Sequence, residues 1–408
     1  MINKLRVAIV SRSNAIGGGA SRIAEELAGW LDGEGIDVGH FCALPFGPLK
    51  SFQSTLYLAG IFGTVTKVTH GVSRKLGVNA LLPIEFFTTL GPKLSQYDVV
   101  HFHDLHSAIS PLSMYLCAQK RAVVFTAHDC SCFTGGCIYP MGCERFRKSC
   151  GNCPQLLPMG GQFDFTGANL RLSRWVAKRS GVQYVFPSEW LRNTASESLR
   201  FGKKAKVIPN GFLPNGYEFR SKGASRKELG IRVEQKVIVI AAHYLAEPRK
   251  GVAFAYSAIR AMTDLDPLVI FVGIPPVDLE QQIAGISFWQ TGFIRSRRRL
   301  GLVFAAADVF LFTSLQDNLP IMIQEALAAG TPVVGFSAGG VPEMVDHGRT
   351  GWLCPVGDQL ALNQNLRDAL TGDQLVQYGE AARSAIREKF DMDVFGRRHL
   401  QLYKEVAK

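Results

Sequence analysis

The sequence predicts an α/β fold with two doubly wound parallel sheets in succession, and three observations support this prediction. Short apolar runs alternate with helical segments in both halves of the chain. The runs are apolar at nearly every position, which is typical of parallel strands covered on both faces. The chain has 408 residues, more than one hydrophobic core usually supports, so two domains are expected.

The first half begins with a strand, a glycine-rich loop and a helix. Residues 5–10 read LRVAIV, the loop SRSNAIGGG follows, and the helical spacing after it stops at Gly35. Further apolar strands are expected at residues 36–44, 98–104, 122–129 and 183–188. We expect the first domain at residues 1–205, with a cysteine-rich insert at residues 130–153.

The second half repeats the alternation of strands and helices. Its strands are expected at residues 236–243, 267–273, 307–314 and 331–337. Proline and glycine punctuate residues 203–215, KKAKVIPNGFLPN, which marks the domain boundary. We expect the second domain at residues 206–385, followed by a helix at residues 386–408 that packs back on the first domain.

Composition places the chain among soluble globular proteins, since 47% of its residues are hydrophobic and 19% are charged. The start, MINKLRVAIV, shows no signal-peptide core. The longest uncharged apolar run, Ser54–Val65, is shorter than the roughly 20 residues that span a bilayer. We therefore expect a cytoplasmic protein without a transmembrane segment.

The net charge of +11 indicates an acidic partner or a solvated basic face. Basic residues gather between Lys67 and Lys75, and again between Arg295 and Arg299. Nucleic acid, an anionic membrane face and phosphorylated small molecules all fit this charge. Charge alone does not choose among them.

Residues 316–334, QDNLPIMIQEALAAGTPVV, predict a loop, a short helix and a buried strand. Pro320 suits the first helical position and Gly330 suits the C-terminal stop. Asp317 precedes the helix and Glu325 lies within it. A helix N-terminus offers free N–H groups and positive dipole, which suit a phosphate. The alternative is an ordinary helix with an acidic first turn.

Gly17, Gly18 and Gly19 lie between a strand and a helix, where backbone N–H groups can approach a phosphate without a Cβ in the way. The loop lacks the G-x-G-x-x-G spacing of dinucleotide sites. Asp37 is about 20 residues further on, but it begins the second strand instead of ending it. An NAD-dependent oxidoreductase therefore remains an alternative with a poor fingerprint.

Histidines cluster in HFHDLH and TAHD. His101 and His103 are two residues apart on an expected strand, so their side chains face the same side, near a site at the strand's carboxyl end. A metal site is one interpretation of this cluster. Packing in the core, with each ring hydrogen-bonded, is the other.

Six of the nine cysteines fall between Cys130 and Cys153. Four of them, Cys137, Cys143, Cys150 and Cys153, have the spacing C-x5-C-x6-C-x2-C. In a cytosolic protein such clustering favours a metal over disulfides, and four thiolates complete a tetrahedral shell for zinc. A structural zinc ion, a redox or iron–sulfur site and free buried thiols remain open.

Three segments together resemble retaining GT-B glycosyltransferases of the family 4 type, which use nucleotide-sugar donors. They are the loop GGGASR, the stretch EPRKG at residues 247–251, and residues 314–358, which begin SLQDNLPIMIQEALAAGTPVV. The cysteine-rich segment HDCSCFTGGCIYPMGCERFRKSCGNCPQL further resembles a subgroup that builds bacterial exopolysaccharides such as colanic acid. The resemblance implies two Rossmann-like domains that face a central cleft.

The resemblance also implies site residues. It implies catalytic roles for His128 and Asp317, a donor site at Gly18, Gly19, Arg249, Lys250, Asn318, Leu319 and Glu325, and an acceptor side at His103 and Asp104. Asp317 would lie near the donor sugar, where such enzymes carry Glu, and Glu325 would hold the ribose hydroxyls. Where the family has another arginine, this sequence has Ala242-His243-Tyr244.

We therefore expect a retaining transfer of a hexosyl unit from a UDP- or GDP-sugar to a saccharide acceptor, lipid-linked, in exopolysaccharide or cell-surface glycan synthesis. The enzyme would bind peripherally to the anionic inner face of the membrane. Structural zinc is possible, and neither a catalytic metal nor nucleic acid is expected. A zinc-knuckle nucleic-acid-binding protein remains a second alternative, which would use the basic surface and would not need Asp317 and Glu325.

Overall fold

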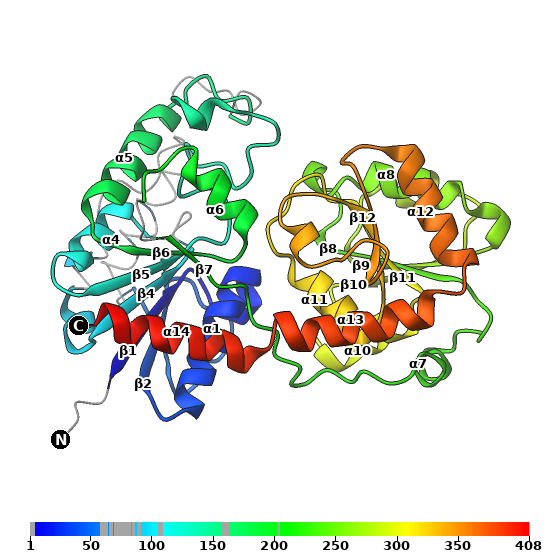
Figure 1. The fold of residues 1–408 in the computed structure, drawn as a ribbon, viewed down its shortest axis with the longest axis horizontal. Coiled ribbons are helices and arrows are strands. Elements are labelled where there is room, and N and C mark those ends of the chain that lie inside the picture. The colour runs from blue at the N-terminus through cyan, green and yellow to red at the C-terminus, as the bar shows by residue number, and fades with distance from the viewer. Residues whose placement is uncertain are drawn as a thin grey trace. The chain divides into compact units, whose positions relative to one another are not determined.

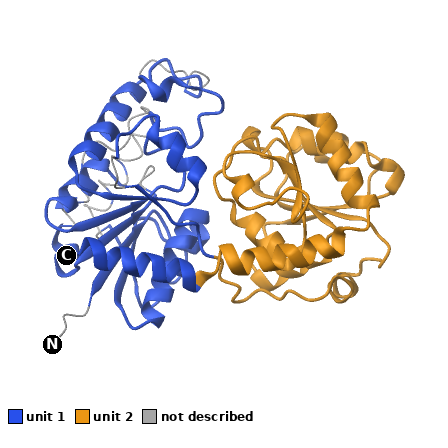
Figure 2. Cartoon of the chain, in the orientation of Figure 1, with its two compact units in different colours: residues 1–211, 393–408 blue, residues 212–392 orange. Residues whose placement is uncertain are grey.

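The computed structural model describes residues 5–57, 64, 68, 83, 86–87, 91–104, 109–156, 164–201 and 205–407. The chain divides into two compact units (Figure 2). Unit 1 comprises residues 1–211 and 393–408, and unit 2 comprises residues 212–392. The sequence had placed these boundaries at 205/206 and 385/386.

Unit 1 contains a seven-stranded parallel sheet in the order β3-β2-β1-β4-β5-β6-β7. The strands are β1 Arg6–Ser11, β2 Asp37–Cys42, β3 Gln53–Thr55, β4 Val99–His103, β5 Ala122–Thr126, β6 Gln183–Phe186 and β7 Ala205–Val207. The strand order reverses direction between β1 and β4. Such a switch point, at the carboxyl ends of the strands, is where open α/β sheets bind ligands.

Helices cover this sheet (Figure 1). They are α1 Gly19–Gly33, α3 Gly91–Lys93, α4 Pro111–Ala118, α5 Thr166–Arg179, α6 Glu189–Ser196 and α14 Met392–Val406. The pleat of β4 divides its side chains between two layers, because Phe102 packs in the core with Met114 of α4 while His101 contacts Tyr403 of α14. Helix α14 is also joined to α1, since Trp30 Nε1 donates to Asp393 Oδ1 at 2.8 Å.

Unit 2 contains a six-stranded parallel sheet in the order β10-β9-β8-β11-β12-β13, with a second switch point between β8 and β11. The strands are β8 Val237–Tyr244, β9 Leu268–Ile274, β10 Phe288–Gly292, β11 Val309–Phe312, β12 Val333–Phe336 and β13 Gly351–Cys354. The helices are α7 Lys222–Leu229, α8 Val252–Arg260, α9 Leu279–Gln282, α10 Arg297–Ala306, α11 Ile321–Ala329, α12 Gln359–Thr371 and α13 Leu375–Lys389.

The alternation of apolar residues along β8 builds two separate cores, one on each face of this sheet. Val237 and Val239 pack with helices α10, α11 and α13, whereas Ile238 and Ile240 pack with α8 and α12 (Figure 1). A strand buried on both faces reads as a continuous apolar run, as the sequence does here. The prediction of two doubly wound parallel sheets is confirmed.

Candidate functional site

The candidate donor site of unit 2 lies on the loops that follow β8 and β11 at the switch point. The loop after β8 carries Arg249 and Lys250, and the loop after β11 carries Asp317. Leu315 N–H donates to Arg249 O at 2.8 Å, which joins the two loops. Positions 249, 250 and 317, far apart in the sequence, are therefore brought together at one end of the sheet.

Asp317 forms a buried ion cluster with both cations. Its Oδ2 atom accepts from Arg249 Nη1 and from Lys250 Nζ, each at 2.9 Å. Burial alone would raise the pKa of Asp317, but the charges of Lys250 and Arg249 outweigh burial and hold this pKa below its ordinary value. The carboxylate is therefore ionised near neutral pH and neutralises much of the positive charge beside it.

Two glycines fix the backbone around this cluster. Gly339 has φ +62°, and a Cβ there would lie 1.9 Å from the carbonyl oxygen of Asp317. Gly251 has φ +61°, and its Cβ would lie 2.2 Å from the carbonyl oxygen of Thr313. Because only glycine combines this conformation with so close an approach, both loops hold the ion cluster in one arrangement.

The helix after Asp317 begins one residue later than the sequence predicts. Pro320 is the N-cap of α11, with φ −66° and ψ 123°, and Gly330 ends the helix in the left-handed conformation. Asn318 and Leu319, expected to offer N–H groups to a phosphate, are both buried, and Asn318 N–H donates to Asp317 Oδ1 at 3.0 Å. The side chain of Asp317 thus already uses one of these donors.

Glu325 is buried in the middle of α11, where it accepts a hydrogen bond from the hydroxyl of Tyr217. The Tyr217 ring stacks on Phe219 with centroids 5.3 Å apart, and the guanidinium of Arg297 lies 5.5 Å from the Tyr217 centroid. Sequence reasoning missed Tyr217 as a neighbour of Glu325 and Arg297 as a neighbour of Tyr217. No spacing pattern could have found Tyr217, because it precedes Glu325 by 108 residues.

In unit 1, the glycine-rich loop lies at the switch point after β1. Gly18 is the N-cap of α1 with φ +128°, no side chain caps this N-terminus, and Gly19 is the first helical residue. Glu25 holds the loop, because its carboxylate accepts from Ala15 N–H at 2.7 Å and pairs with Lys50 Nζ at 2.7 Å. These two contacts order the loop before α1, and anion binding at Gly18 and Gly19 stays a prediction.

The histidines of β4 and the segment after β5 form one hydrogen-bonded group. His103 Nδ1 lies 3.0 Å from His128 Nε2, and His103 Nε2 lies 3.2 Å from His101 Nδ1. The prediction that His101 and His103 face the same side is confirmed. Asp104 follows directly, with φ +57°. Burial lowers the pKa of His128 to about 3 and those of His101 and His103 well below the ordinary value, so all three rings are neutral.

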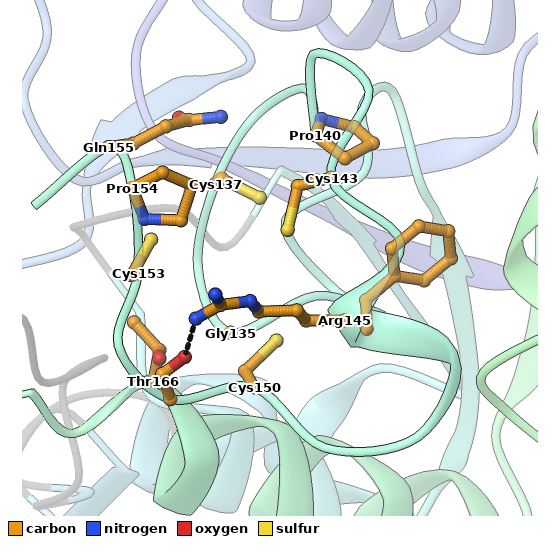
Figure 3. Close-up of a pocket in the computed structure, with 12 residues that line it drawn as sticks. Gly135, Cys137, Pro140, Cys143, Arg145, Cys150, Cys153, Pro154, Gln155 and Thr166 are labelled. Carbon is orange, nitrogen blue, oxygen red and sulfur yellow. Dashed lines mark hydrogen bonds between the residues drawn. The ribbon is translucent and has the colours of Figure 1, made fainter.

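The four spaced cysteines line one cavity in the segment between β5 and α5 (Figure 3). Arg145 extends among Cys137, Cys143, Cys150 and Cys153, and its Nη1 donates to the carbonyl oxygen of Gly151 at 2.7 Å. The nine cysteines all lie in the described ranges and form no disulfide with one another. Burial is the chief cause that raises the pKa of Cys137 to about 11. Within the described ranges, no three His, Cys, Asp or Glu side chains are placed to hold a metal ion together.

The structure describes only one of the two basic clusters in full, that at residues 295–299. Lys67, Arg74 and Lys75 lie outside the described residues. In the other cluster, Arg298 pairs with both Glu218 and Glu228. In the part of the chain that the structure describes, no helix is long and apolar enough to cross a membrane.

Known proteins resemble both halves of the chain. A family model described as "Glycosyltransferase Family 4" matches residues 17–212, and one described as "Glycosyl transferases group 1" matches residues 235–372. The N-acetyl-alpha-D-glucosaminyl L-malate synthase of Bacillus anthracis is 25% identical over 226 residues, which are 54% of this chain and 59% of that protein. The putative colanic acid biosynthesis glycosyl transferase WcaC of Escherichia coli is 24% identical over 305 residues, 70% of this chain and 72% of WcaC.

The amylovoran biosynthesis glycosyltransferase AmsK of Erwinia amylovora is 26% identical over 220 residues, 50% of this chain. The chain matches only 59% of the length of the Bacillus anthracis protein and 52% of the length of AmsK. Among solved structures, HepE of Anabaena in complex with UDP and glucose superposes with a TM-score of 0.67 at 18% identity, over 98% of this chain and 100% of HepE. At that identity the likeness shows the fold alone. The two family models, which together span most of the chain, and this shared fold lead to one conclusion: the chain belongs to the family 4 glycosyltransferases and has the GT-B fold.

Proposed function

We propose that this protein transfers a hexosyl unit from a nucleotide sugar to a saccharide acceptor in the synthesis of an exopolysaccharide or a related cell-surface glycan. The observation that carries the proposal is the buried cluster of Arg249, Lys250 and Asp317 at the switch point of unit 2. Relatives named for colanic acid and amylovoran biosynthesis support the class of product. HepE, solved with UDP and glucose, supports a UDP-sugar as donor.

The ion cluster suits a diphosphate leaving group. As the glycosidic bond of the donor breaks, negative charge grows on the diphosphate, and nearby cations stabilise that charge. Arg249 and Lys250 can turn from Asp317 toward the incoming phosphates. Asp317, released from its cations, then accepts hydrogen bonds from hydroxyls of the donor sugar. Glu325 accepts from the ribose hydroxyls in place of, or together with, Tyr217.

His128, which follows β5 in unit 1, is the second proposed catalytic residue, with Asp104 on the acceptor side. His103 is fully buried, so it would act on the acceptor only through its hydrogen bond to His128. Gly18 and Gly19 would offer backbone N–H groups to the donor. Transfer with retention of the anomeric configuration is part of the proposal. NMR of the glycosidic linkage tests retention, because an inverting enzyme would give the opposite anomer from the same donor.

The acceptor is proposed to be lipid-linked and presented at the anionic inner face of the membrane, to which the basic residues around Lys67–Lys75 would bind peripherally. The protein would then work in the cytoplasm. Nucleic acid is not expected as a partner, because the cluster of Asp317 with its cations has no role in binding it.

We also infer that the four-cysteine cavity binds a structural zinc ion. Four sulfurs already face one cavity, and four thiolates are a complete shell for zinc. Binding would require the sulfurs to draw closer together, and Arg145 would offset part of the negative charge of four thiolates. Such a site leaves no open position for substrate, so no catalytic role for a metal follows from it.

Mass spectrometry of the products formed from a panel of UDP- and GDP-sugars tests the proposed function. One donor should give a product heavier than the saccharide acceptor by one hexosyl unit, with release of the nucleoside diphosphate. Asp317→Ala protein is the matched control and should give none. Failure of every donor with every acceptor, in protein whose fold is intact, would contradict the proposal.

A further inference from the structure

A row of hydrogen-bonded rings runs through the interior of unit 1, from helix α14 to His128. The hydroxyl of Tyr403 lies 2.6 Å from His101 Nδ1, and Thr126 Oγ1 lies 2.7 Å from His101 Nε2. His103 joins the row through Nε2, 3.2 Å from His101 Nδ1, and through Nδ1, 3.0 Å from His128 Nε2. Tyr403, His101 and His103 are fully buried.

The first proton of the row can be placed from Tyr403. Among the described residues, the Tyr403 hydroxyl has a single hydrogen-bond partner, His101 Nδ1. A buried hydroxyl that does not donate leaves an unsatisfied donor, which proteins avoid. Tyr403 therefore donates to His101 Nδ1. A neutral imidazole carries one proton, so His101 carries it on Nε2 and donates it to Thr126 Oγ1.

The proton positions of His103 and His128 follow from that of His101. Since His101 Nδ1 holds a lone pair, a second lone pair on His103 Nε2 at 3.2 Å would repel it, so His103 Nε2 carries the proton. His103 Nδ1 is then an acceptor, and its hydrogen-bond partner among the described residues, His128 Nε2 at 3.0 Å, donates to it. His128 is thereby left with the lone pair on Nδ1.

We propose that Tyr403, on the C-terminal helix, sets the tautomer of His128 two histidines away and so acts as a positioning residue for the transfer reaction. The effect of this tautomer on catalysis rests on the proposed function, whereas the assignment of the tautomer itself does not. With the lone pair on Nδ1, His128 accepts a hydrogen bond from a sugar hydroxyl at that nitrogen. The opposite tautomer would instead present an N–H donor there, suited to a phosphate oxygen.

Burial and neighbouring groups keep the row neutral, which the assignment requires. The His399 ring stacks on His101 with centroids 5.4 Å apart, and burial lowers the pKa of His399 to about 4. Burial likewise lowers the pKa values of the three histidines in the row. A protonated ring would donate from both nitrogens and break the sequence of donors and acceptors.

The competing arrangement is the reverse row, in which each of the three rings carries its proton on Nδ1. The only hydrogen bond that it loses among the described residues is the one that Tyr403 donates. With Thr126 donating to His101 Nε2, every ring could donate from Nδ1, and every nitrogen contact of the row would still be satisfied. Only the hydroxyl proton of Tyr403 would lose its acceptor among the described residues. Tyr403→Phe removes that proton, so the variant should permit the reverse row without loss of a ring contact.

Long-range proton–nitrogen NMR correlations of the imidazole groups, measured on the full chain, distinguish the two tautomers. In the wild type, His101, His103 and His128 should all show the Nε2–H pattern, and any of them in the Nδ1–H form would overturn the assignment. In Tyr403→Phe, His128 should shift toward the Nδ1–H pattern. The matched control is Tyr256→Phe, because the buried Tyr256 hydroxyl has no partner among the described residues. It should leave the His128 signals unchanged.

Thr126→Val tests whether Tyr403 or Thr126 sets the tautomer. This variant loses the contact at His101 Nε2, but Tyr403 still donates to His101 Nδ1. The His128 pattern should stay as in the wild type. A shift there, or an unchanged pattern in Tyr403→Phe, would overturn the proposal, and the wild-type spectrum provides the test if a variant does not fold.

Steady-state kinetics of the transfer reaction are the second measurement that tests the proposal. Tyr403→Phe should lower kcat by about tenfold with the donor KM unchanged, the effect of one hydrogen bond altered in the transition state. If the tautomer shifts and kcat does not change, the proposed role of His128 fails while the positioning by Tyr403 stands. If kcat falls and the tautomer is unchanged, the inference about Tyr403 fails instead.

Discussion

At the scale of single residues, Asp317 is the side chain whose state would decide whether the proposed donor site is open. It neutralises Arg249 and Lys250 in the chain without ligand, and it accepts the N–H of Asn318. In the proposed function, an incoming diphosphate would therefore have to compete with a carboxylate for the same two cations. The resemblance to known enzymes predicted these residues, but not that they would contact one another.

Asp317→Asn should destabilise unit 2 by roughly 1.5 to 3 kcal/mol, because Lys250 loses its carboxylate partner while Arg249 keeps its ion pair with Glu247. UDP should then raise the melting temperature of the variant more than that of the wild type, since the diphosphate replaces the missing charge. Differential scanning calorimetry with and without UDP measures both effects. The matched control is Asp264→Asn, whose ion pair with Arg367 is exposed. Equal shifts by UDP in variant and wild type would contradict the competition.

Glu325→Gln tests the proposed contact with the ribose. The glutamine oxygen can still accept from Tyr217, so the fold should be kept, but the charge-assisted hydrogen bonds to the donor are lost. The loss in kcat/KM for the nucleotide sugar should correspond to roughly 1.5 to 3 kcal/mol. Steady-state kinetics measure it, with Glu280→Gln, an exposed residue of α9, as control. Unchanged kinetics in folded protein would remove Glu325 from the site.

At the scale of elements, the sequence predicted the central strands well and the edge strands poorly. Strands β1, β8 and β11 are continuous apolar runs because helices cover both of their faces. Strands β3 and β7 read QST and AKV, with an exposed residue in each, and neither contains an apolar run from which it could be predicted. The candidate site was predictable where a motif is local, as in EPRKG. Contacts such as Tyr403 with His101, 302 residues apart, leave no pattern in the sequence.

The segment between β5 and α5 has little regular structure in its described residues, 127–156 and 164–165, and their packing suggests how a metal would act. Its end lies against α5, since a Cβ at Gly167 would be 2.7 Å from the carbonyl oxygen of Cys150, and Cys153 N–H donates to Asp164 Oδ2 at 2.7 Å. A zinc ion held by the four cysteines would join the two ends of this segment. It would stabilise the chain that follows His128.

Protein purified without chelator should contain about one zinc per chain by elemental analysis, because four cysteines complete one zinc shell. Cys150→Ser should lose the metal and some activity, whereas Cys117→Ala should keep both, since Cys117 is buried in the core away from the cavity. Metal-free wild-type protein with normal activity would rule the site out. So would equal metal loss in both variants.

At the scale of the whole molecule, the buried neutral histidines belong to one unit. Burial lowers the pKa values of His40 and His399 to about 4 and that of His128 to about 3, and it lowers those of His101 and His103 well below their ordinary value. All five lie in unit 1. As the pH falls below the ordinary value of 6.5, the unfolded chain binds protons at these histidines and the folded chain does not. Stability is therefore complete above that pH and declines below it.

The free energy of unfolding of unit 1 should fall by about 1.4 kcal/mol per pH unit for each such histidine, between about pH 6.5 and pH 4. His399→Phe should make this slope shallower by about one proton, because phenylalanine keeps the ring packing and cannot titrate. Chemical denaturation at several pH values measures the slope. His347→Phe, in unit 2, is the control and should leave it unchanged. A slope equal in His399→Phe and wild type would contradict the explanation.

Membrane binding is a property of the molecule that the proposed function requires. Vesicles with anionic lipid should float the protein more than neutral vesicles, and salt should release it, because each basic residue near the surface contributes about 1 kcal/mol. Replacing Lys67, Arg74 and Lys75 together by alanine should abolish the difference. Arg232→Ala, an exposed residue of unit 2, should not. Equal flotation with both kinds of vesicle would count against the peripheral site.

The return of the chain to unit 1 after residue 392 has a consequence for biosynthesis. Every residue of unit 2 leaves the ribosome before α14 does, so unit 2 can fold while unit 1 still lacks the helix that bears Tyr403 and His399. Until then His101 Nδ1 lacks the hydroxyl of Tyr403, and one layer of the first sheet is uncovered. The half of the protein that is translated first is thus the half that matures last, and a prematurely terminated chain would expose that layer to chaperones and proteases.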